Sequence, residues 1–393
     1  MPVESESPRR KACEVETPSA PLRETEKAST REPKASVGRI LELDALRGIA
    51  ALAVVLFHYT TRYEDLFGRS SRLPFHFDWG EYGVDLFFML SGFVILMTLE
   101  RTSDSLKFAW GRFTRLYPAY WAAVGLTFVL VLSCGLPGMQ VRLVDAVLNM
   151  TMIQALLGAP HVDGAYWSLQ AELIFYVNML LLFRWGAFTR PVRAAITWVG
   201  LAILMILAQR YLAPQSSLLG ELISKCMTLM SLKFIALFAI GILVFDARRR
   251  TDGRMATLMA ILVCFAAVGL RKGPEVMLID VVLASLFAAA VYGRLSFLNA
   301  RWLVFLGAIS YSLYLTHQNI GFIIMMQLER VGVPPVLAIV AAIAVAFAVA
   351  IQLHRLVEKP ALEQLRRVDI VASWHAWRQR LFGTGRSSDS RIG

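Results

Sequence analysis

Arg47 and His58 stand inside the apolar run LDALRGIAALAVVLFHY, residues 43–59, which is typical of a membrane-spanning helix. A charged side chain at the centre of a bilayer costs at least about 2.5–3.5 kcal/mol, so ionisable residues there tend to be functional. Eleven residues of α-helix rise about 16 Å and turn the chain to within about 20° of its starting direction. The spacing therefore predicts that both side chains share one helix face at different depths, as in the wall of a crevice.

Glu172 is a carboxylate in the apolar segment YWSLQAELIFY, residues 166–176, with no Lys or Arg beside it in the sequence. We place it in the outer half of its helix, about 9 Å beyond Tyr166 and at a depth similar to that of His58. A carboxylate beside an imidazole raises its basicity and fixes its tautomer, which suits a general base. We expect Glu172 to pair with His58; the alternative is a buried carboxyl group hydrogen-bonded for packing.

Arg112 and Arg115 lie in KFAWGRFTRLYPAYW, residues 107–121, which we interpret as a cytoplasmic loop. Because they are three residues apart, they share one face of any helical turn that forms there. Paired guanidinium groups suit bidentate contacts to phosphate, so one interpretation is a clamp for a phosphorylated cytosolic ligand. The other interpretation is that these arginines only mark the inner face of the membrane.

Asp85 and Ser91 belong to the apolar segment GVDLFFMLSGFVI, residues 83–95. Asp85 falls near the expected outer boundary of the membrane, where it is either a solvated carboxylate or a group that lines the site. Ser91 stands among small residues, which favour close packing of helices in lipid. Both are kept as residues that could line the site.

A polar stripe runs along ISYSLYLTHQNI, residues 309–320, where Ser310, Tyr314 and His317 recur at helical spacing. Such a stripe faces either substrate or other helices, and the sequence leaves both alternatives open. Neither the histidines nor the four cysteines show a metal-binding spacing, so we predict no metal.

Membrane helices must position these residues, because the chain is 56% hydrophobic, has a mean hydropathy of +0.55 and concentrates its apolar residues in runs. About 20 apolar residues cross the hydrocarbon core as a helix. The sequence predicts an all-α, polytopic membrane protein with about ten transmembrane helices. The expected spans are 40–60, 83–99, 118–134, 166–183, 194–212, 226–245, 256–270, 276–292, 302–325 and 335–353.

Lys and Arg are more frequent in the connections on the side of the N-terminus than in the opposite ones, which predicts that both termini are cytoplasmic. We expect a disordered tail over residues 1–38, a transmembrane domain over residues 39–362 and a basic tail over residues 363–393. The net charge of +11 follows from this topology. No basic stripe alternates with aromatic residues, so the sequence argues against a nucleic-acid partner.

Taken together, these segments resemble the acyltransferase family 3 of integral membrane proteins. The resemblance covers residues 40 to 362 and is carried in order by Arg47 with His58, GVDLFFMLSGFVI, RFTRLYP, YWSLQAELIFY, ISYSLYLTH and the closing Glu358-Lys359-Pro360. It implies transfer of an acyl group, often acetyl, from a cytoplasmic acyl-CoA to a hydroxyl of a carbohydrate-type acceptor. Such acceptors include surface polysaccharides, lipopolysaccharide and lipid-linked sugars, and the implied location is the inner (cytoplasmic) membrane.

By the same resemblance, His58, Arg47 and Glu172 are catalytic, and Arg112 with Arg115 engages the donor. Acyl-CoA is then a substrate, no permanently bound cofactor is implied, and a partner protein is expected to supply any later step. Two rival functions remain open. A transporter also uses ionisable residues at the midplane but should show inverted repeats, which this sequence lacks. A non-catalytic sensor or scaffold would keep the packing motifs without needing His58.

Overall fold

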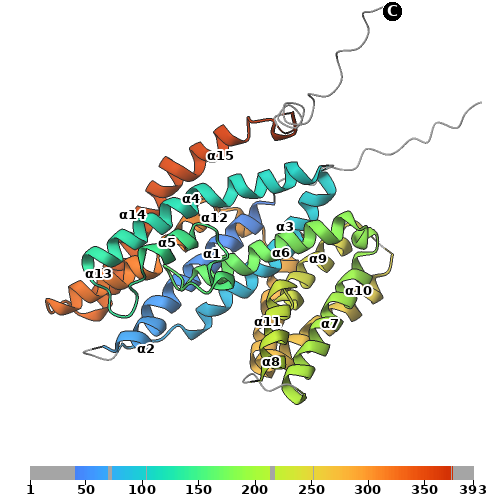
Figure 1. Ribbon diagram of the computed structural model, residues 1–393, viewed down its shortest axis with the longest axis horizontal. Coiled ribbons are helices and arrows are strands. Elements are labelled where there is room, and N and C mark those ends of the chain that lie inside the picture. Colours follow the sequence, from blue (N-terminus) through green and yellow to red (C-terminus); the bar gives the residue numbers. More distant parts are fainter. Residues whose placement is uncertain are drawn as a thin grey trace, which may run out of the picture. The chain divides into compact units, whose positions relative to one another are not determined.

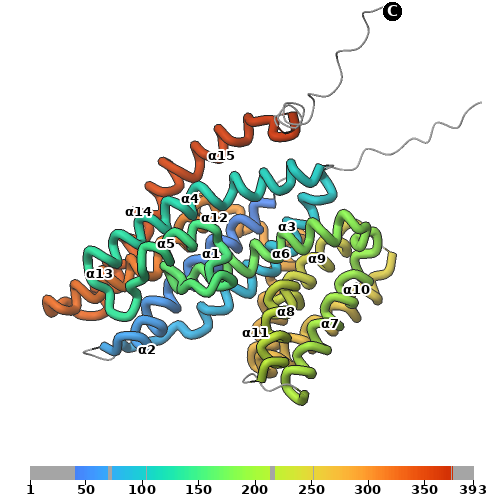
Figure 2. Tube along the Cα trace, viewed as in Figure 1, coloured from blue at the N-terminus to red at the C-terminus, as the bar shows by residue number. Residues whose placement is uncertain are grey.

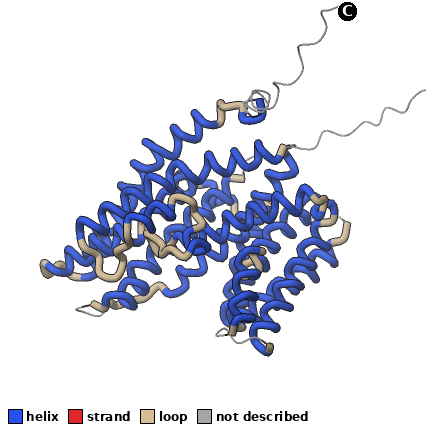
Figure 3. The backbone as a smooth tube through the Cα atoms, viewed as in Figure 1, coloured by secondary structure: helices blue, strands red, loops and turns tan. Residues whose placement is uncertain are grey.

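The computed structural model describes residues 40–372 and 374, apart from residues 70–72, 103, 213–216 and 251. This described part consists of helices joined by loops and turns, without a strand (Figure 3). The all-α prediction is confirmed for these residues. The expected tail over residues 1–38 lies outside them, as does most of the expected tail over residues 363–393.

The helices carry the labels of Figure 1. The first half of the fold comprises α1 (Leu41–Phe57), the π-helical turn η1 (His58–Arg62), α2 (Tyr63–Phe67), η2 (Asp78–Tyr82), α3 (Gly83–Arg101), α4 (Ser105–Cys134), α5 (Leu143–Asn149), η3 (Gln154–Leu157), α6 (Tyr166–Arg184), η4 (Ala187–Thr189) and α7 (Pro191–Tyr211). The second half comprises α8 (Leu218–Leu229), α9 (Ile235–Arg249), α10 (Arg254–Lys272), α11 (Pro274–Val291), η5 (Ser296–Asn299), α12 (Arg301–Thr316), α13 (Gln318–Arg330), α14 (Pro335–Leu353), the π-helical turn η6 (His354–Glu358) and α15 (Lys359–Leu365).

Among the described residues, seven helices are long and apolar enough to cross a membrane, which makes the chain a multi-pass membrane protein. They are Asp78–Arg101 (η2 with α3), α4, α6, α7, α10, α11 and Pro335–Leu365 (α14 to α15). Helices α9 and α12 have 15 and 16 residues, fewer than the about 20 needed to cross about 30 Å of hydrocarbon, whereas α1 continues without a gap through η1 and α2 to Phe67. The expected count of about ten spans and the cytoplasmic side of the termini stay predictions.

Helix α1 packs against α12 and α3, and α3 packs against α9 (Figure 1). Two of these contacts require glycine. A Cβ added at Gly48 of α1 would lie 2.6 Å from the backbone nitrogen of Gly307 in α12. A Cβ added at Gly92 of α3 would lie 2.0 Å from the carbonyl oxygen of Phe238 in α9. Small residues at such points let helices approach closely in lipid. Helices α7 to α11 form a second group, which contacts α3 through α9 and α11 (Figure 2).

The segment expected as a cytoplasmic loop, residues 107–121, is helical, because α4 begins at Ser105. The Asp104 carboxylate caps this helix by accepting hydrogen bonds from the backbone nitrogens of Leu106 and Lys107. Pro118 lies inside the helix, where it removes one backbone hydrogen bond. The prediction was wrong because it took Pro118 as the start of the membrane span, whereas the flanking turns keep the helix continuous.

Two expected spans are each divided by a break that apolar periodicity does not reveal. The span 226–245 becomes α8 and α9, separated by a turn in which Ser231 has a φ of +58°. The span 302–325 divides at His317, between α12 and α13. At this second break, the carbonyl oxygen of His317 accepts a hydrogen bond of 2.7 Å from the Tyr59 hydroxyl, so a contact with η1 holds the broken helix.

Candidate active site

His58 is the first residue of the π-helical turn η1, directly after α1. Its Nδ1 lies 2.8 Å from the carbonyl oxygen of Val54 and 3.3 Å from Nε2 of His317. The two imidazole rings meet edge to face, with centroids 4.8 Å apart. His58 is half-buried as a residue, whereas His317 is fully buried.

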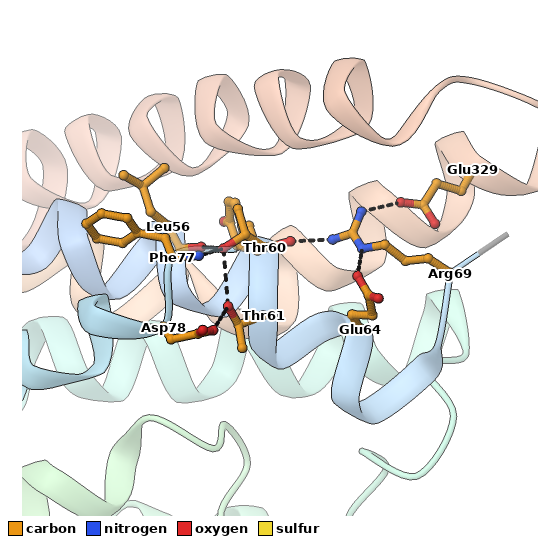
Figure 4. A network of polar contacts seen from close by, with 9 residues as sticks. Leu56, Thr60, Thr61, Glu64, Arg69, Phe77, Asp78 and Glu329 are labelled. Carbon is orange, nitrogen blue, oxygen red and sulfur yellow. Dashed lines mark hydrogen bonds and ion pairs between the residues drawn. The ribbon is translucent and has the colours of Figure 1, made fainter. Parts of the chain in front are cut away.

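The turn that carries His58 is held on one side by the segment before α3 (Figure 4). The Thr60 hydroxyl donates to the carbonyl oxygen of Leu56 at 2.7 Å and accepts from the backbone nitrogen of Phe77 at 3.0 Å. The Thr61 hydroxyl donates to the Asp78 carboxylate at 2.7 Å. A π-helical turn departs from the α-helical pattern of backbone hydrogen bonds and is frequent at functional sites. These side-chain contacts stabilise it here.

Arg69 holds the same turn from the other side (Figure 4). Its guanidinium group donates to the carbonyl oxygen of Tyr59 and, at 3.0 Å, to the carboxylate of Glu329, and it lies 3.6 Å from Glu64. The Arg69 side chain is 1% exposed. Burial lowers the pKa of Arg69 and raises the pKa of Glu329. The mutual attraction of the two opposes both shifts, so each charge depends on its partner. Sequence reasoning missed this pair because no local pattern connects its members.

Glu172 has other partners than those predicted. Its carboxylate accepts hydrogen bonds from the Ser91 hydroxyl of α3 and, at 2.5 Å, from the Tyr176 hydroxyl one turn further along α6. In the described part of the chain, these contacts are distinct from those of His58, and the predicted Glu172–His58 pair is wrong. A similar depth on two helices does not determine which of their side chains meet, and Tyr166, which was taken as a surface residue, is fully buried.

Arg47 lies at the level of Glu172. Its guanidinium group is 3.9 Å from the Asp44 carboxylate within α1 and interacts electrostatically with Arg115, Glu172 and Tyr176. Arg47 precedes His58 by about 16 Å along the helix axis. The two residues singled out by their spacing therefore belong to two separate clusters, one in the first half of α1 and one directly after its end.

Arg115 is committed to a carboxylate that the sequence analysis had quoted only as part of a motif. Its guanidinium group bonds to Glu358, the last residue of η6, and lies over the ring of Tyr311. Glu358 also accepts from the Ser312 hydroxyl at 2.6 Å and contacts Nδ1 of His354 at 3.0 Å. Arg115 is thus not a guanidinium group presented freely to the cytoplasm. The sequence feature that could have identified Glu358 is its position as a carboxylate shortly after the long apolar helix α14.

Arg112 differs from Arg115 in having aromatic neighbours. Its guanidinium carbon lies 6.0 Å from the ring centroid of Phe108 and 5.9 Å from that of Tyr176. Among the described residues, its Nε atom is buried without a hydrogen-bond partner. A buried donor left unpaired is costly, so this guanidinium group is the better candidate for an anionic ligand.

Asp85 and Tyr314 have structural partners. Asp85 is buried and bonds at 2.5 Å to Lys272 at the end of α10, so it is a paired and not a solvated carboxylate. The Tyr314 hydroxyl lies 2.6 Å from that of Ser168 and its ring lies 5.6 Å from that of His317. Of the polar stripe, His317 belongs to the imidazole pair. Tyr314 instead joins α12 to α6 through its contact with Ser168.

A groove lies between the start of α4 and the residues after α15. It has a volume of about 340 Å³. Its lining includes Lys107, Trp110, Arg366 and Arg367. The Trp110 indole nitrogen donates to the carbonyl oxygen of Leu365 at 3.0 Å, which fixes one wall. Three cations beside an aromatic ring suit a ligand that carries phosphate and a planar base.

The arrangement is that of a multi-pass membrane protein with a pair of imidazoles after the end of α1 and arginines with carboxylates around Arg47 nearer its start. Comparison with known proteins identifies its class: the model of acyltransferase family 3, an acyltransferase domain, matches residues 40–355, and the chain belongs to this family. It is therefore an enzyme that transfers acyl groups.

Individual relatives agree with this assignment. The chain is 25% identical to the exopolysaccharide production protein ExoZ of Rhizobium meliloti (strain 1021), over 78% of this chain and 97% of the relative. It is 33% identical to protein 2 in the picA locus of Rhizobium radiobacter, over 44% of this chain and 96% of the relative. It is 30% identical to the acyltransferase MdmB of Streptomyces mycarofaciens, over 38% of this chain and 40% of the relative. No solved structure matches the chain.

Proposed function

We propose that the chain moves an acyl group, in the simplest case acetyl, from cytoplasmic acyl-CoA to a hydroxyl of a carbohydrate-type acceptor at the inner membrane of the cell. The observation that carries the proposal is the separation of two clusters along α1. A partly accessible imidazole follows α1 at His58, and a cluster of arginines and carboxylates surrounds Arg47. Acyl transfer from a phosphorylated thioester needs a base and an anion site that are apart.

The anion end suits coenzyme A, which carries phosphates and an adenine at one end and its thiol at the other. The unpaired Nε of Arg112 and the groove formed by Lys107, Trp110, Arg366 and Arg367 offer guanidinium, ammonium and indole groups. Phosphate favours such charge-assisted contacts, and adenine stacks on aromatic rings. The extended pantetheine arm would then carry the thioester along α1 toward His58.

In the proposed reaction, His58 acts as a general base on the acceptor hydroxyl. The hydroxyl oxygen forms a bond to the thioester carbonyl carbon, the carbon–sulfur bond breaks, and the proton taken by His58 passes to the departing thiolate. The products are the acyl ester and free CoA. Arg47 and Glu172 remain candidates for ordering the donor, because they lie near Arg112 and not near the base.

The class of acceptor rests on the printed name of one relative, a protein of exopolysaccharide production. A surface polysaccharide or its lipid-linked precursor supplies hydroxyl groups and reaches a membrane enzyme from the outer side. We propose such an acceptor, with a partner protein for any later step of assembly. Family membership favours this enzyme over a transporter or a scaffold.

The test is acyl transfer by the purified protein in nanodiscs, with radiolabelled acetyl-CoA and the carbohydrate and lipid-linked fractions of the producing cells. We expect His58→Ala to lower turnover at least about 10²- to 10⁴-fold, the usual contribution of a general base. His76→Ala is the matched control, because His76 is exposed in a loop on the same side. Near-normal turnover by a folded His58→Ala protein would refute the proposed mechanism.

A further inference from the structure

The imidazoles of His58 and His317 form a chain of hydrogen bonds whose direction is set by carbonyl groups. Nδ1 of His317 lies 2.9 Å from the carbonyl oxygen of Tyr314 and 3.2 Å from that of Leu313. Nδ1 of His58 lies 2.8 Å from the carbonyl oxygen of Val54. A carbonyl oxygen only accepts hydrogen bonds, so both Nδ1 atoms must carry a hydrogen.

Because a neutral imidazole has one hydrogen on nitrogen, Nε2 of each ring carries only a lone pair. Nε2 of His317 lies 3.3 Å from Nδ1 of His58, so it accepts from the same Nδ1–H that points toward Val54. The opposite assignment would set the lone pairs of both Nδ1 atoms against carbonyl oxygens. Nε2 of His58 is thereby left as the basic atom of the pair.

Burial separates the roles of the two rings. His317 is 0% exposed, whereas part of His58 is accessible. The backbone around His317 is fixed, because its carbonyl oxygen accepts from the Tyr59 hydroxyl at 2.7 Å and the backbone nitrogen of Asn319 donates to the Asp163 carboxylate at 3.0 Å. An imidazole held in this way can set the orientation and the tautomer of its neighbour.

We propose that His317 is a positioning residue for His58: it accepts the Nδ1–H of His58 and so presents Nε2 to the hydroxyl of the acyl acceptor. When His58 takes the hydroxyl proton at Nε2, its Nδ1–H becomes a stronger donor to His317 and to Val54. Hydrogen bonds from charged donors are stronger than those between neutral groups, so the contact favours the protonated base that forms during transfer. This inference rests on the acyl transfer proposed above.

The test compares two substitutions at one position. His317→Gln keeps a side-chain oxygen that accepts from His58, whereas His317→Phe keeps a ring and removes the acceptor. With acetyl-CoA as donor, we expect His317→Phe to lower kcat about 10- to 100-fold, the value of one hydrogen bond to a charged group, and to leave the KM for acetyl-CoA unchanged. His317→Gln should recover most of the lost kcat.

Thr316→Val is the matched control, because it removes a buried hydrogen bond of 2.9 Å to the carbonyl oxygen of Ser312 next to the same helix break and leaves both imidazoles and their contacts in place. Wild-type kcat in His317→Phe would overturn the proposal. Equal losses in the Gln and Phe variants would also overturn it, as would a loss in Thr316→Val as large as that in His317→Phe, because each pattern indicates a role in folding alone.

The tautomer can be measured without turnover and without a substitution at position 317. In nanodiscs, NMR of the protein labelled with ¹⁵N-histidine should show a signal of the Nδ1–H form that disappears in His58→Gln. If the signal that disappears in His58→Gln is instead that of an Nε2–H form, the proposal is overturned. If the wild type transfers no acyl group, the proposed function fails, and the NMR result still decides how the two rings share their hydrogens.

Discussion

Arg112 and Arg115 have the same side chain and lie one turn apart on α4, yet their surroundings give them different tasks. Arg115 bonds to the buried carboxylate of Glu358, which the Ser312 hydroxyl and His354 also contact. The rings of Phe108 and Tyr176 lie 6.0 and 5.9 Å from the Arg112 guanidinium carbon, and among the described residues the Arg112 Nε has no hydrogen-bond partner. We therefore expect Arg115 to contribute to stability and Arg112 to contribute to donor binding.

Arg112→Gln should raise the KM for acetyl-CoA about 10- to 100-fold, because a charge-assisted bond to phosphate is lost, and should leave thermal stability near that of the wild type. Arg115→Gln should instead lower thermal stability, because Glu358 is left buried without its counter-charge. Donor kinetics and thermal unfolding in nanodiscs measure both effects. Arg184→Gln is a control for bulk charge, since Arg184 is exposed. Unchanged donor kinetics in Arg112→Gln would indicate that this arginine only marks the inner face of the membrane.

At this scale the sequence singled out polar residues in apolar segments, but it did not predict which of them meet. Arg47, His58, Glu172 and His317 stood out because each interrupts an apolar segment. The contacts of His58 with His317 and of Arg115 with Glu358 join residues 259 and 243 positions apart. Helical periodicity acts over a few turns, so it carries no information about such pairs.

At the scale of elements, residues of the candidate site lie where the helices depart from regular α-helical geometry. His58 begins the π-helical turn η1, Glu358 ends the π-helical turn η6, and His317 stands at the break between α12 and α13. The sequence predicted the apolar runs on both sides of these points, because a run of hydrophobic residues determines a membrane helix. It did not predict the irregular turns, because hydrogen bonds from other elements stabilise them.

Substitution of Arg69 tests whether its contacts with η1 are needed for stability and for acyl transfer. Arg69→Met removes the donor to the Tyr59 carbonyl and leaves Glu329 without its partner, so it should lower thermal stability by roughly 3–5 kcal/mol, the range for breaking a buried ion pair. Transfer should fall further than the folded fraction, because η1 carries His58. Arg62→Met is the matched control: its ion pair with Asp65 spans 4.0 Å and is exposed, so a change within about 1 kcal/mol is expected. Equal effects of the two substitutions would argue against a clamp at Arg69.

At the scale of the whole molecule, contacts between helix ends assign the two clusters to opposite sides of the described bundle. Arg249 at the end of α9 pairs with Glu100 at the end of α3, one turn from the start of α4 and its basic groove. At the other end, Arg69 joins the turn after α1 to Glu329 at the end of α13. The lengths of α3 and α13 separate these ends, so a donor site and a base site at opposite ends must face different compartments or be joined by a long substrate.

We predict that the two ends of the described bundle face opposite sides of the membrane, and the proposed function depends on this topology. Reporter fusions after Arg250 should report the cytoplasm, because α9 ends there beside the groove proposed for acyl-CoA. Fusions after Gly332, in the turn between α13 and α14, should report the outer side, because that turn lies beyond Glu329 at the end that carries His58. In sealed vesicles, acetyl-CoA should then support transfer only from the side that Arg250 faces, since the charged phosphates of CoA prevent it from crossing the bilayer. The reverse pattern of reporters would place Lys107, Arg366 and Arg367 outside the cell, where CoA is not supplied. It would exclude the groove as a donor site even if His58 remained essential for turnover.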